Sequence, residues 1–370
     1  MKKLLFILLS IIASTAFAQQ LFPIKVKSKW GYTNVAGKLV IQATYDYAEY
    51  FFEGRAVVAL NNQPCVINEQ NVRIIDTGLY ISIQRYSEGL ARVTDVKLKQ
   101  YYVDLSGKVI FELKGNYYDA RPFKNGLAGV TRNVELHETK FNRDIVTLGY
   151  LFGYINKNGE EVVPCKYDDA DDYANGLARV KLNGKFGYID SDGKEVIALK
   201  YKNLGKFMEG KAVVEVDGKY GFIDTLGNEI IKPVYDYAFD FSEGLAAVMM
   251  EGKYGFIDAT GKLIINPQYQ TVRPFSDGMA AVKIENKWGF IDATGKLVLR
   301  PVFDDATLFV EQRCPVLLKR KWGFIDKTGR LVIPAEFDAV GTFNNGLAEV
   351  SIGQVEVYVN HSGIIIPQLR

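Results

Sequence analysis

The chain has 370 residues, with 45 Lys and Arg against 43 Asp and Glu, so its net charge is close to zero. A near-neutral, evenly mixed chain lacks the basic field that nucleic acid or an anionic membrane surface attracts, which argues against both as partners. A composition of 48% hydrophobic and 13% aromatic residues excludes a disordered chain and predicts a well-packed, ordered protein.

Residues 1–18 have the pattern of a secretory signal peptide. Two lysines precede an apolar run over residues 4–18, which ends in an A-F-A cleavage pattern at Ala18. Fifteen helical residues span roughly 22 Å, short of the ~30 Å hydrocarbon core, so a membrane anchor is the weaker interpretation. We expect cleavage after Ala18, export to the periplasm or the medium, and no stable membrane span in residues 19–370.

The rest of the chain, residues 19–370, is one repeat array. An aspartate or asparagine recurs along it, with seven of nine spacings equal to 34 residues, one of 36 and one of 52. A second element, F-x-x-G-L-A-x-V, recurs in step with the first. A fixed period of this size indicates a repeat architecture without a separate domain. The recurring positions are Asn34, Asn68, Asp104, Asn156, Asp190, Asp224, Asp258, Asp292, Asp326 and Asn360.

Each repeat carries the signals of three antiparallel strands, as residues 244–277 illustrate. GLAAVMM is β-patterned and ends at Glu251-Gly252, where sister repeats have Asn-Gly or Asp-Gly, the favoured pair of a two-residue hairpin turn. KYGFID predicts the returning strand, and Asp258 with Gly261 predicts a turn into a third strand, KLIINP. About eleven irregular residues then lead to the next repeat, so each unit is a three-stranded meander plus a connector.

Ten such meanders predict an all-β repeat protein. A single meander is marginally stable, and strands such as KLIINP are apolar on both faces, so neighbouring units must cover one another. Propellers commonly have four to eight blades of four strands. Ten three-stranded units therefore favour an open, curved β-solenoid or superhelix, with a propeller-like ring or rings as the alternative. The last repeat ends in Ile364-Ile365-Ile366, either an imperfect cap or a docking face.

The repeats resemble the WG repeat family, also called KWG repeats. The resemblance lies in KWGYTNVAGKLV, KWGFIDATGKLV and KWGFIDKTGRLV, with YDYAFDFSEGLAAV between copies, and covers roughly residues 29–366. Three repeats depart from it, with Cys65, Tyr101 and Val357 in the glycine position. The resemblance implies a β-rich bacterial protein, often exported, in a scaffold or binding role, and supplies no catalytic residues.

The repeated residues are better explained by structure than by chemistry. Ten equivalent positions cannot each hold a general acid, and asparagine replaces aspartate at several of them, as expected for a side chain that caps its own turn. The connector acids Asp46, Asp119, Asp168, Asp236, Asp304 and Asp338 follow the same logic. The rings beside the repeated glycine, such as Tyr220 and Phe222, are expected in the core between units, with a row of exposed rings as the alternative.

The sequence predicts no catalytic or metal site and no cofactor. It contains no G-x-S-x-G, no H-E-x-x-H and no phosphate-binding glycine loop, and its only histidines are His137 and His361. Three cysteines without a C-x-x-C motif favour buried thiols over a zinc or redox site, and whether any two are bridged stays open. Those cysteines are Cys65, Cys165 and Cys314.

The one candidate binding site lies where the repeat is interrupted. The 52-residue spacing contains an insertion at about 131–150, between a first and a second strand, which is expected to extend that hairpin beyond its neighbours. A tolerated loop insertion is the plainer interpretation. The residues expected near its tip are His137, Glu138, Lys140 and Arg143.

We therefore expect an exported, non-enzymatic repeat scaffold that binds a protein or glycan partner along its elongated surface. The alternatives are a carbohydrate-active enzyme or accessory subunit that uses Asp and Glu carboxylates, and a passive spacer. One deep pocket with two carboxylates from different repeats would favour the enzyme, and a flat or gently concave surface with scattered rings would favour binding. The partner and the oligomeric state are not determined by the sequence.

Overall fold

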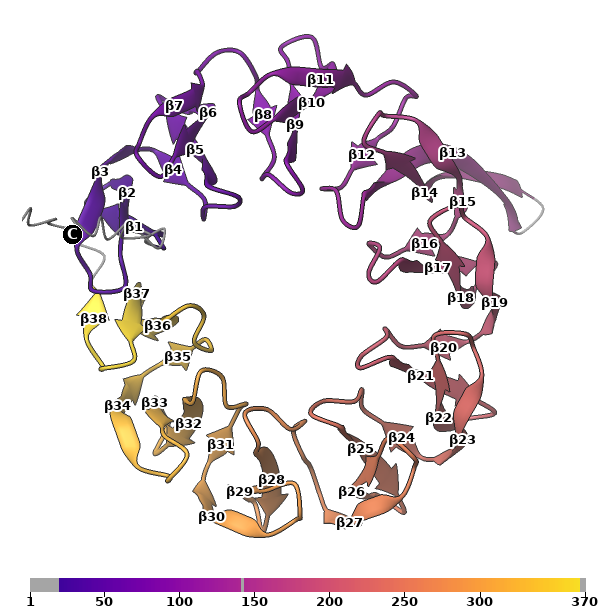
Figure 1. The fold of residues 1–370 in the computed structure, drawn as a ribbon, viewed down its shortest axis with the longest axis vertical. Helices are drawn as coiled ribbons and strands as arrows, with labels where there is room; N and C mark the ends of the chain where they lie inside the picture. The colour runs from indigo at the N-terminus through magenta and orange to yellow at the C-terminus, as the bar shows by residue number, and fades with distance from the viewer. Residues whose placement is uncertain (1–19, 141–142, 367–370) are drawn as a thin grey trace, which may run out of the picture.

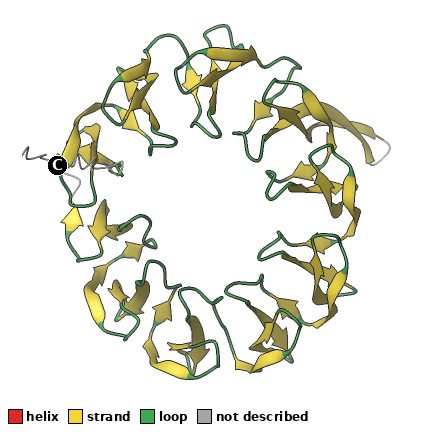
Figure 2. Ribbon diagram, viewed as in Figure 1, coloured by secondary structure: helices red, strands yellow, loops and turns green. Residues whose placement is uncertain are grey.

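The computed structural model of the protein describes residues 20–140 and 143–366, without the side chains of 136–146. This part of the chain forms ten sheets that close into a ring, a ten-bladed β-propeller (Figure 1). The open solenoid favoured by the sequence is therefore wrong, and the propeller alternative is correct. Figure 2 shows strands and loops but no helix, so no helix of the described residues could cross a membrane.

The strands follow one another blade by blade. Blade one comprises β1 (Phe22–Val26), β2 (Lys29–Thr33) and β3 (Leu39–Tyr45), and blade two comprises β4 (Tyr47–Ala48), β5 (Arg55–Leu60), β6 (Gln63–Asn68) and β7 (Arg73–Ile75). Blade three comprises β8 (Ser82–Ile83), β9 (Leu90–Thr94), β10 (Gln100–Asp104) and β11 (Val109–Glu112). Blade four comprises β12 (Asp119–Ala120), β13 (Leu127–Lys140), β14 (Arg143–Asn156) and β15 (Glu161–Tyr167). Blades five to seven comprise β16 (Asp169–Ala170), β17 (Leu177–Leu182), β18 (Lys185–Asp190) and β19 (Glu195–Tyr201); β20 (Asn203–Leu204), β21 (Lys211–Val216), β22 (Lys219–Asp224) and β23 (Glu229–Tyr235); and β24 (Tyr237–Ala238), β25 (Leu245–Met250), β26 (Lys253–Asp258) and β27 (Leu263–Tyr269). Blades eight to ten comprise β28 (Ala280–Ile284), β29 (Lys287–Ile291) and β30 (Leu297–Phe303); β31 (Asp305–Ala306), β32 (Cys314–Leu318), β33 (Lys321–Ile325) and β34 (Leu331–Phe337); and β35 (Ala339–Val340), β36 (Leu347–Ile352), β37 (Val355–Asn360) and β38 (Ile365–Ile366).

The connector supplies a fourth strand that the repeat pattern does not reveal. In blade seven, Tyr237 and Ala238 of β24 pair with Met249 and Val248 of β25, on the side nearest the centre of the ring (Figure 1). Eight blades have such a two-residue inner strand, and blade eight has a single bridge, Val272 to Val282, in its place. Each connector thus reaches from the outer strand of one blade to the inner edge of the next, which is the geometry of a propeller.

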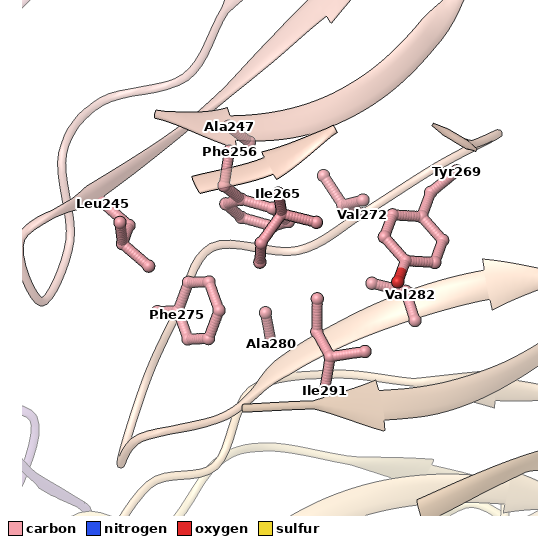
Figure 3. Close-up of a cluster of buried hydrophobic side chains, with 10 residues drawn as sticks. All are labelled: Leu245, Ala247, Phe256, Ile265, Tyr269, Val272, Phe275, Ala280, Val282 and Ile291. Carbon is pink, nitrogen blue, oxygen red and sulfur yellow. The ribbon is translucent and has the colours of Figure 1, made fainter. Parts of the chain in front are cut away.

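The hydrophobic core lies between blades. Figure 3 shows one such cluster, in which Phe256 and Ile265 of blade seven meet Phe275 of the following connector and Ile291 of blade eight. The rings of Phe256 and Phe275 lie edge to face, with centroids 4.9 Å apart. Eight blades repeat this ring contact with the connector that follows them, so the turn from one blade to the next is repeated as well, and ten blades return the chain to its start.

The two rings beside the repeated glycine differ in burial. The second ring, represented by Phe222, is completely buried, as the sequence predicts. The first ring, represented by Tyr220, is only half-buried, although Trp288 in the same position is 5% exposed. The core prediction is therefore confirmed for the second ring and only partly for the first.

The repeated glycine is required by the close approach of the third strand. A Cβ on Gly255 would lie 2.7 Å from the backbone nitrogen of Pro267 and closer still to the carbonyl oxygen of Ile265. Strand β27 reaches this position through a bulge in its pairing with β26. In two of the three repeats with another residue there, the third strands β7 and β11 have three and four residues instead of seven.

The first and last blades close the ring by side-chain packing. The yellow C-terminal blade lies beside the indigo N-terminal blade in Figure 1. Phe22 and Ile24 of β1 form a buried cluster with Leu347, Tyr358 and Ile366 of blade ten. Ile366 also lies under Gly37, in the place that Ile265 takes under Gly295. Ile366 is therefore covered by blade one and is not a docking face, whereas Ile364 is exposed.

Candidate functional site at the closure of the ring

The repeated acid or amide of every blade caps its own turn. In blade seven, Asp258 Oδ1 accepts hydrogen bonds from the backbone N–H groups of Thr260 at 2.8 Å and Lys262 at 3.1 Å. The Thr260 hydroxyl, followed by these N–H groups, holds the pKa of Asp258 below its usual value. Asn34 makes the same pair of bonds, to Ala36 and Lys38. The structural interpretation of these residues is confirmed, and they are not candidates for catalysis.

The connector acids have structural roles too. Asp236 accepts from the Lys219 ammonium at 2.6 Å and from the backbone N–H of Glu251 at 2.8 Å. Asp46, Asp304 and Asp338 each bind a lysine and a hairpin-turn N–H in the same way. Asp168 binds only the turn N–H of Gly184, and Asp119 pairs with Arg92 instead.

The insertion at about 131–150 lengthens the hairpin of β13 and β14, which projects outward from blade four in Figure 1. The backbone register pairs His137 with Val146, Glu138 with Ile145 and Lys140 with Arg143. The side chains of His137, Glu138, Lys140 and Arg143 lie outside the described part of the structure. The binding site placed there from the sequence therefore stays a prediction.

The three cysteines lie in separate blades and form no disulfide. Cys65 in β6 and Cys314 in β32 are buried, and Cys165 in β15 is half-buried. Burial raises the pKa of the Cys165 thiol to about 11, which keeps the thiol protonated and unreactive at neutral pH. Over the residues that the structure describes, His, Cys, Asp and Glu do not gather into a group that could hold a metal ion.

A pocket lies where the ring closes, and we call it the closure pocket. It has a volume of about 440 Å³ and is lined by residues of blades one, two and ten, with Arg85 of blade three. Its aromatic members are Trp30, Tyr47, Tyr50, Phe52 and Tyr358, and its charged members are Glu49, Arg85, Glu349 and Glu356. Tyr47, Glu349 and Glu356 are exposed, so the pocket is shallow. Sequence reasoning did not identify it.

A hydrogen-bonded group joins the two sides of the closure pocket. The Tyr50 hydroxyl donates to Glu349, and the Tyr50 and Tyr358 hydroxyls lie 2.7 Å apart. Burial, with the Glu349 carboxylate beside it, raises the pKa of Tyr50 to about 12. Burial also raises the pKa of Glu49 above its usual value. The tyrosines therefore stay neutral near pH 7, and the pocket has three carboxyl groups against the single cation Arg85.

The aromatic side of the closure pocket resembles other places in the propeller where an arginine or lysine of the same chain stacks on an aromatic side chain. In two other blades an arginine stacks on the aromatic residue just before the repeated glycine. The Arg273 guanidinium lies 5.2 Å from the Trp288 ring centre, and the Arg179 guanidinium lies 5.1 Å from the Phe186 ring centre. At Trp30 the Lys25 ammonium is 5.8 Å away. An aromatic ring with a nearby carboxylate suits a cationic group, and the flat ring equally suits the apolar face of a sugar.

The closure pocket could not be found from the sequence because it joins distant segments. Tyr50 and Tyr358 are 308 residues apart. Tyr358 occupies the second-ring position, which is tyrosine in other blades too, as at Tyr32 and Tyr102, whereas the connector position of Tyr50 does not recur as tyrosine. Only closure of the ring brings blade ten against blade one. The one available signal was the propeller alternative itself, because a ring must have a place where its ends meet.

Comparison with known proteins places the chain among repeat proteins of one kind. The pattern described as WG containing repeat matches residues 30–63, 102–133, 152–186, 186–220, 220–254, 254–288, 288–322 and 322–354. No curated protein sequence matches the chain.

Comparison with solved structures finds similarity at low sequence identity. A crystal structure described as the eukaryotic initiation factor is 11% identical over 94% of both chains, with a TM-score of 0.53. BamB from Moraxella catarrhalis is 10% identical over 94% of this chain and 95% of its own, with a TM-score of 0.34. The first similarity supports the fold alone, because a fold of this kind can host unrelated functions.

Proposed function

The chain belongs to the WG containing repeat family, and on that premise we propose that it is an exported, non-enzymatic binding ring. Its closure pocket binds a basic segment of a partner polypeptide. The observation that carries this proposal is the composition of the pocket, in which five aromatic rings stand beside three carboxylates and one arginine. Such a surface attracts a lysine or arginine side chain electrostatically and stacks its aliphatic stem.

A specific observation also favours a second candidate, a carbohydrate-active enzyme. Glu49, with a raised pKa, and Glu349 come from different blades and line the same pocket. Paired carboxylates in different environments are the usual means of glycoside hydrolysis. The exposure of Glu349 and Glu356 weighs against this candidate, because an open site leaves the reacting bond in water.

Tryptophan fluorescence separates the candidates. The chain has three tryptophans, so the double variant Trp288→Phe/Trp322→Phe leaves Trp30 in the closure pocket as the only reporter. Phenylalanine already occupies this position in blades four and five, at Phe152 and Phe186, so the variant is matched to the repeat itself. The variant is titrated with a lysine-containing hexapeptide, with its glutamine counterpart, and with chitotetraose.

A saturable change in Trp30 fluorescence with the lysine peptide alone supports the proposal. This change should be lost in the variant Glu349→Gln/Glu356→Gln. Saturation by chitotetraose, with release of reducing ends that Glu49→Gln abolishes, would favour the enzyme. If no ligand changes the fluorescence, the proposal is contradicted and the passive spacer is the remaining alternative. A wild-type melting temperature in each variant is the control for folding.

Two parts of the proposal rest on sequence alone. Export depends on residues 1–18, which lie outside the described residues, and the hairpin tip depends on side chains that also lie outside them. The hairpin is proposed as a second contact for the partner. Its test is independent of the closure pocket and is given below.

A further inference from the structure

At four junctions between blades, an aspartate bridges a lysine of one blade and a hairpin-turn N–H of the next, and we call this arrangement the clamp. At the junction of blades six and seven, one oxygen of Asp236 accepts from the Lys219 ammonium of blade six. Its other oxygen accepts from the N–H of Glu251, in the hairpin turn of blade seven. The lysine and the turn N–H hold the pKa of Asp236 below its usual value, so the carboxylate is charged. The clamp thus needs a lysine, a carboxylate and a turn N–H.

At the junction of blades five and six the clamp lacks its carboxylate. The position that corresponds to Asp236 is Lys202, 34 residues earlier. The lysine and the hairpin turn of the clamp are still there, as Lys185 and Asp217-Gly218. Within the described residues, the Lys185 ammonium and the turn N–H groups of Asp217 and Gly218 have no hydrogen-bond partner.

These unpartnered groups face a common pocket. Lys185, Lys200, Lys202, Asp217 and Gly218 line a pocket of about 640 Å³ between the two blades. Three acids, Glu215, Asp217 and Glu229, also line it. Glu215 accepts a hydrogen bond from the Asn203 amide, and no ion pair joins any of the three acids to the lysines across the described residues. The acids lower the overall charge of the pocket without filling the place of the missing carboxylate.

We propose that this junction binds the carboxylate of an aspartate or glutamate side chain supplied by another polypeptide. One carboxylate oxygen accepts from Lys185 and the other from the turn N–H of Asp217, as Asp236 does with Lys219 and Glu251. Lys202 adds a second cation, and the bound anion relieves its repulsion from Lys185. The four complete clamps of the same ring are the template for the ligand and for its orientation.

This site is distinct from the closure pocket and does not depend on the proposed function. It lies at the junction of blades five and six, whereas the closure pocket lies at blades ten and one. Its ligand has the opposite charge. A partner that uses both would carry basic and acidic segments at separate places, and each contact can be tested without the other.

The test is an NMR titration that follows the chemical shifts of the backbone N–H groups of the full-length protein. The chain is titrated with N-acetyl-aspartate N-methylamide, and with N-acetyl-asparagine N-methylamide as the neutral isostere. We expect saturable shifts at Asp217 and Gly218 with the aspartate derivative alone. No shift is expected at Glu251, whose N–H is already bound by Asp236. Equal ionic strength in all samples removes general salt effects.

Two exchange variants make the result decisive. Lys202→Asp rebuilds the clamp of the sister junctions, so it should abolish the shifts at Asp217 and raise the melting temperature. Asp236→Lys copies the incomplete clamp into the next junction, so a new ligand-dependent shift should appear at Glu251. Equal responses to the aspartate and asparagine derivatives, or shifts at Asp217 that persist in Lys202→Asp, would overturn the proposal.

Discussion

The hydroxyl groups of Tyr50 and Tyr358 lie 2.7 Å apart, although the residues are 308 positions apart in the chain. Tyr358 belongs to β37 of the last blade, and Tyr50 follows the inner strand β4 of the second. The Tyr50 hydroxyl donates to Glu349, and the Tyr358 hydroxyl lies 3.3 Å from the same carboxylate oxygen, so three side chains link the two ends of the ring. Among residues 20–366 as described, no strand is exchanged between the first and last blades, so these contacts and the cluster around Phe22 close the ring.

Closure by packing predicts that Ile366→Ala destabilises the whole ring. Ile366 is 2% exposed and fills the closing cluster, so removing its side chain leaves a cavity that should cost about 2–4 kcal/mol. Ile364→Ala is the matched control, because Ile364 is 56% exposed and should change stability by less than about 0.5 kcal/mol. Urea unfolding measures both. Equal midpoints for the two variants would mean that Ile366 does not stabilise the closure.

The close approach of the third strand predicts that Gly255→Ala is severely destabilising. The added Cβ would meet the backbone at Ile265 and Pro267, which cannot move without breaking the bulge, so we expect a loss of about 3 kcal/mol or more. Gly252→Ala is the control: Gly252 has a φ of 74° but open space around it, so only about 1 kcal/mol of strain is expected. Thermal unfolding compares them, and a larger loss for Gly252→Ala would refute the steric explanation.

The turn-capping role of Asp258 predicts a pH-dependent contribution to stability. Its folded pKa lies below the reference value of 3.8, so the carboxylate stabilises the fold above about pH 4 and loses this effect as pH falls through the folded pKa. Asp258→Asn keeps the two turn hydrogen bonds, as Asn34 does, and removes this pH dependence. Asp258→Ala should lower the melting temperature at every pH. The check is a series of melting curves from pH 7 to pH 2, where an identical pH dependence of the wild type and the Asp258→Asn variant would contradict the assignment.

The signal-peptide prediction is that the secreted protein begins at Gln19. Expression of the full chain followed by N-terminal sequencing of the periplasmic and culture-medium fractions measures this directly. Ala18→Arg is the control, because a large charged residue at the cleavage site should block processing and retain the precursor. Recovery of the unprocessed chain in the soluble fraction would contradict export by this route.

The extended hairpin can be removed without disturbing the ring. Deleting residues 133–148 joins Arg132 to Gly149, so that Gly149-Tyr150 forms a two-residue turn between the paired residues Arg132 and Leu151. The ion pair of Arg132 with Glu161 at the base of the hairpin is kept. We expect a melting temperature within a few degrees of the wild type. If the hairpin contacts a partner, affinity capture from periplasm should recover that partner with the full chain and not with the deletion variant.

Much of each blade could be predicted from the sequence, but little of the candidate site. The turn signals at Glu251-Gly252 and at Asp258 to Gly261 correctly placed the three long strands, because turn chemistry is local. The inner strand β24 was missed, because a two-residue strand has no periodicity and exists only where the connector passes the next blade. The closure pocket was missed for the same reason, since Tyr50 and Tyr358 meet only in the closed ring.

The sequence by itself determined the unit: its three strands, its turns and the apolar faces that force units to stack. It also determined that the repeated acid of each unit is structural, because ten equivalent residues that interchange Asp and Asn cap turns. Only the tertiary structure decided between an open array and a closed ring. That choice depends on the small rotation between neighbouring blades, which packing such as Phe256 on Phe275 sets and no local signal encodes. Ring closure in turn placed blade ten against blade one and created the pocket on which the proposed function rests.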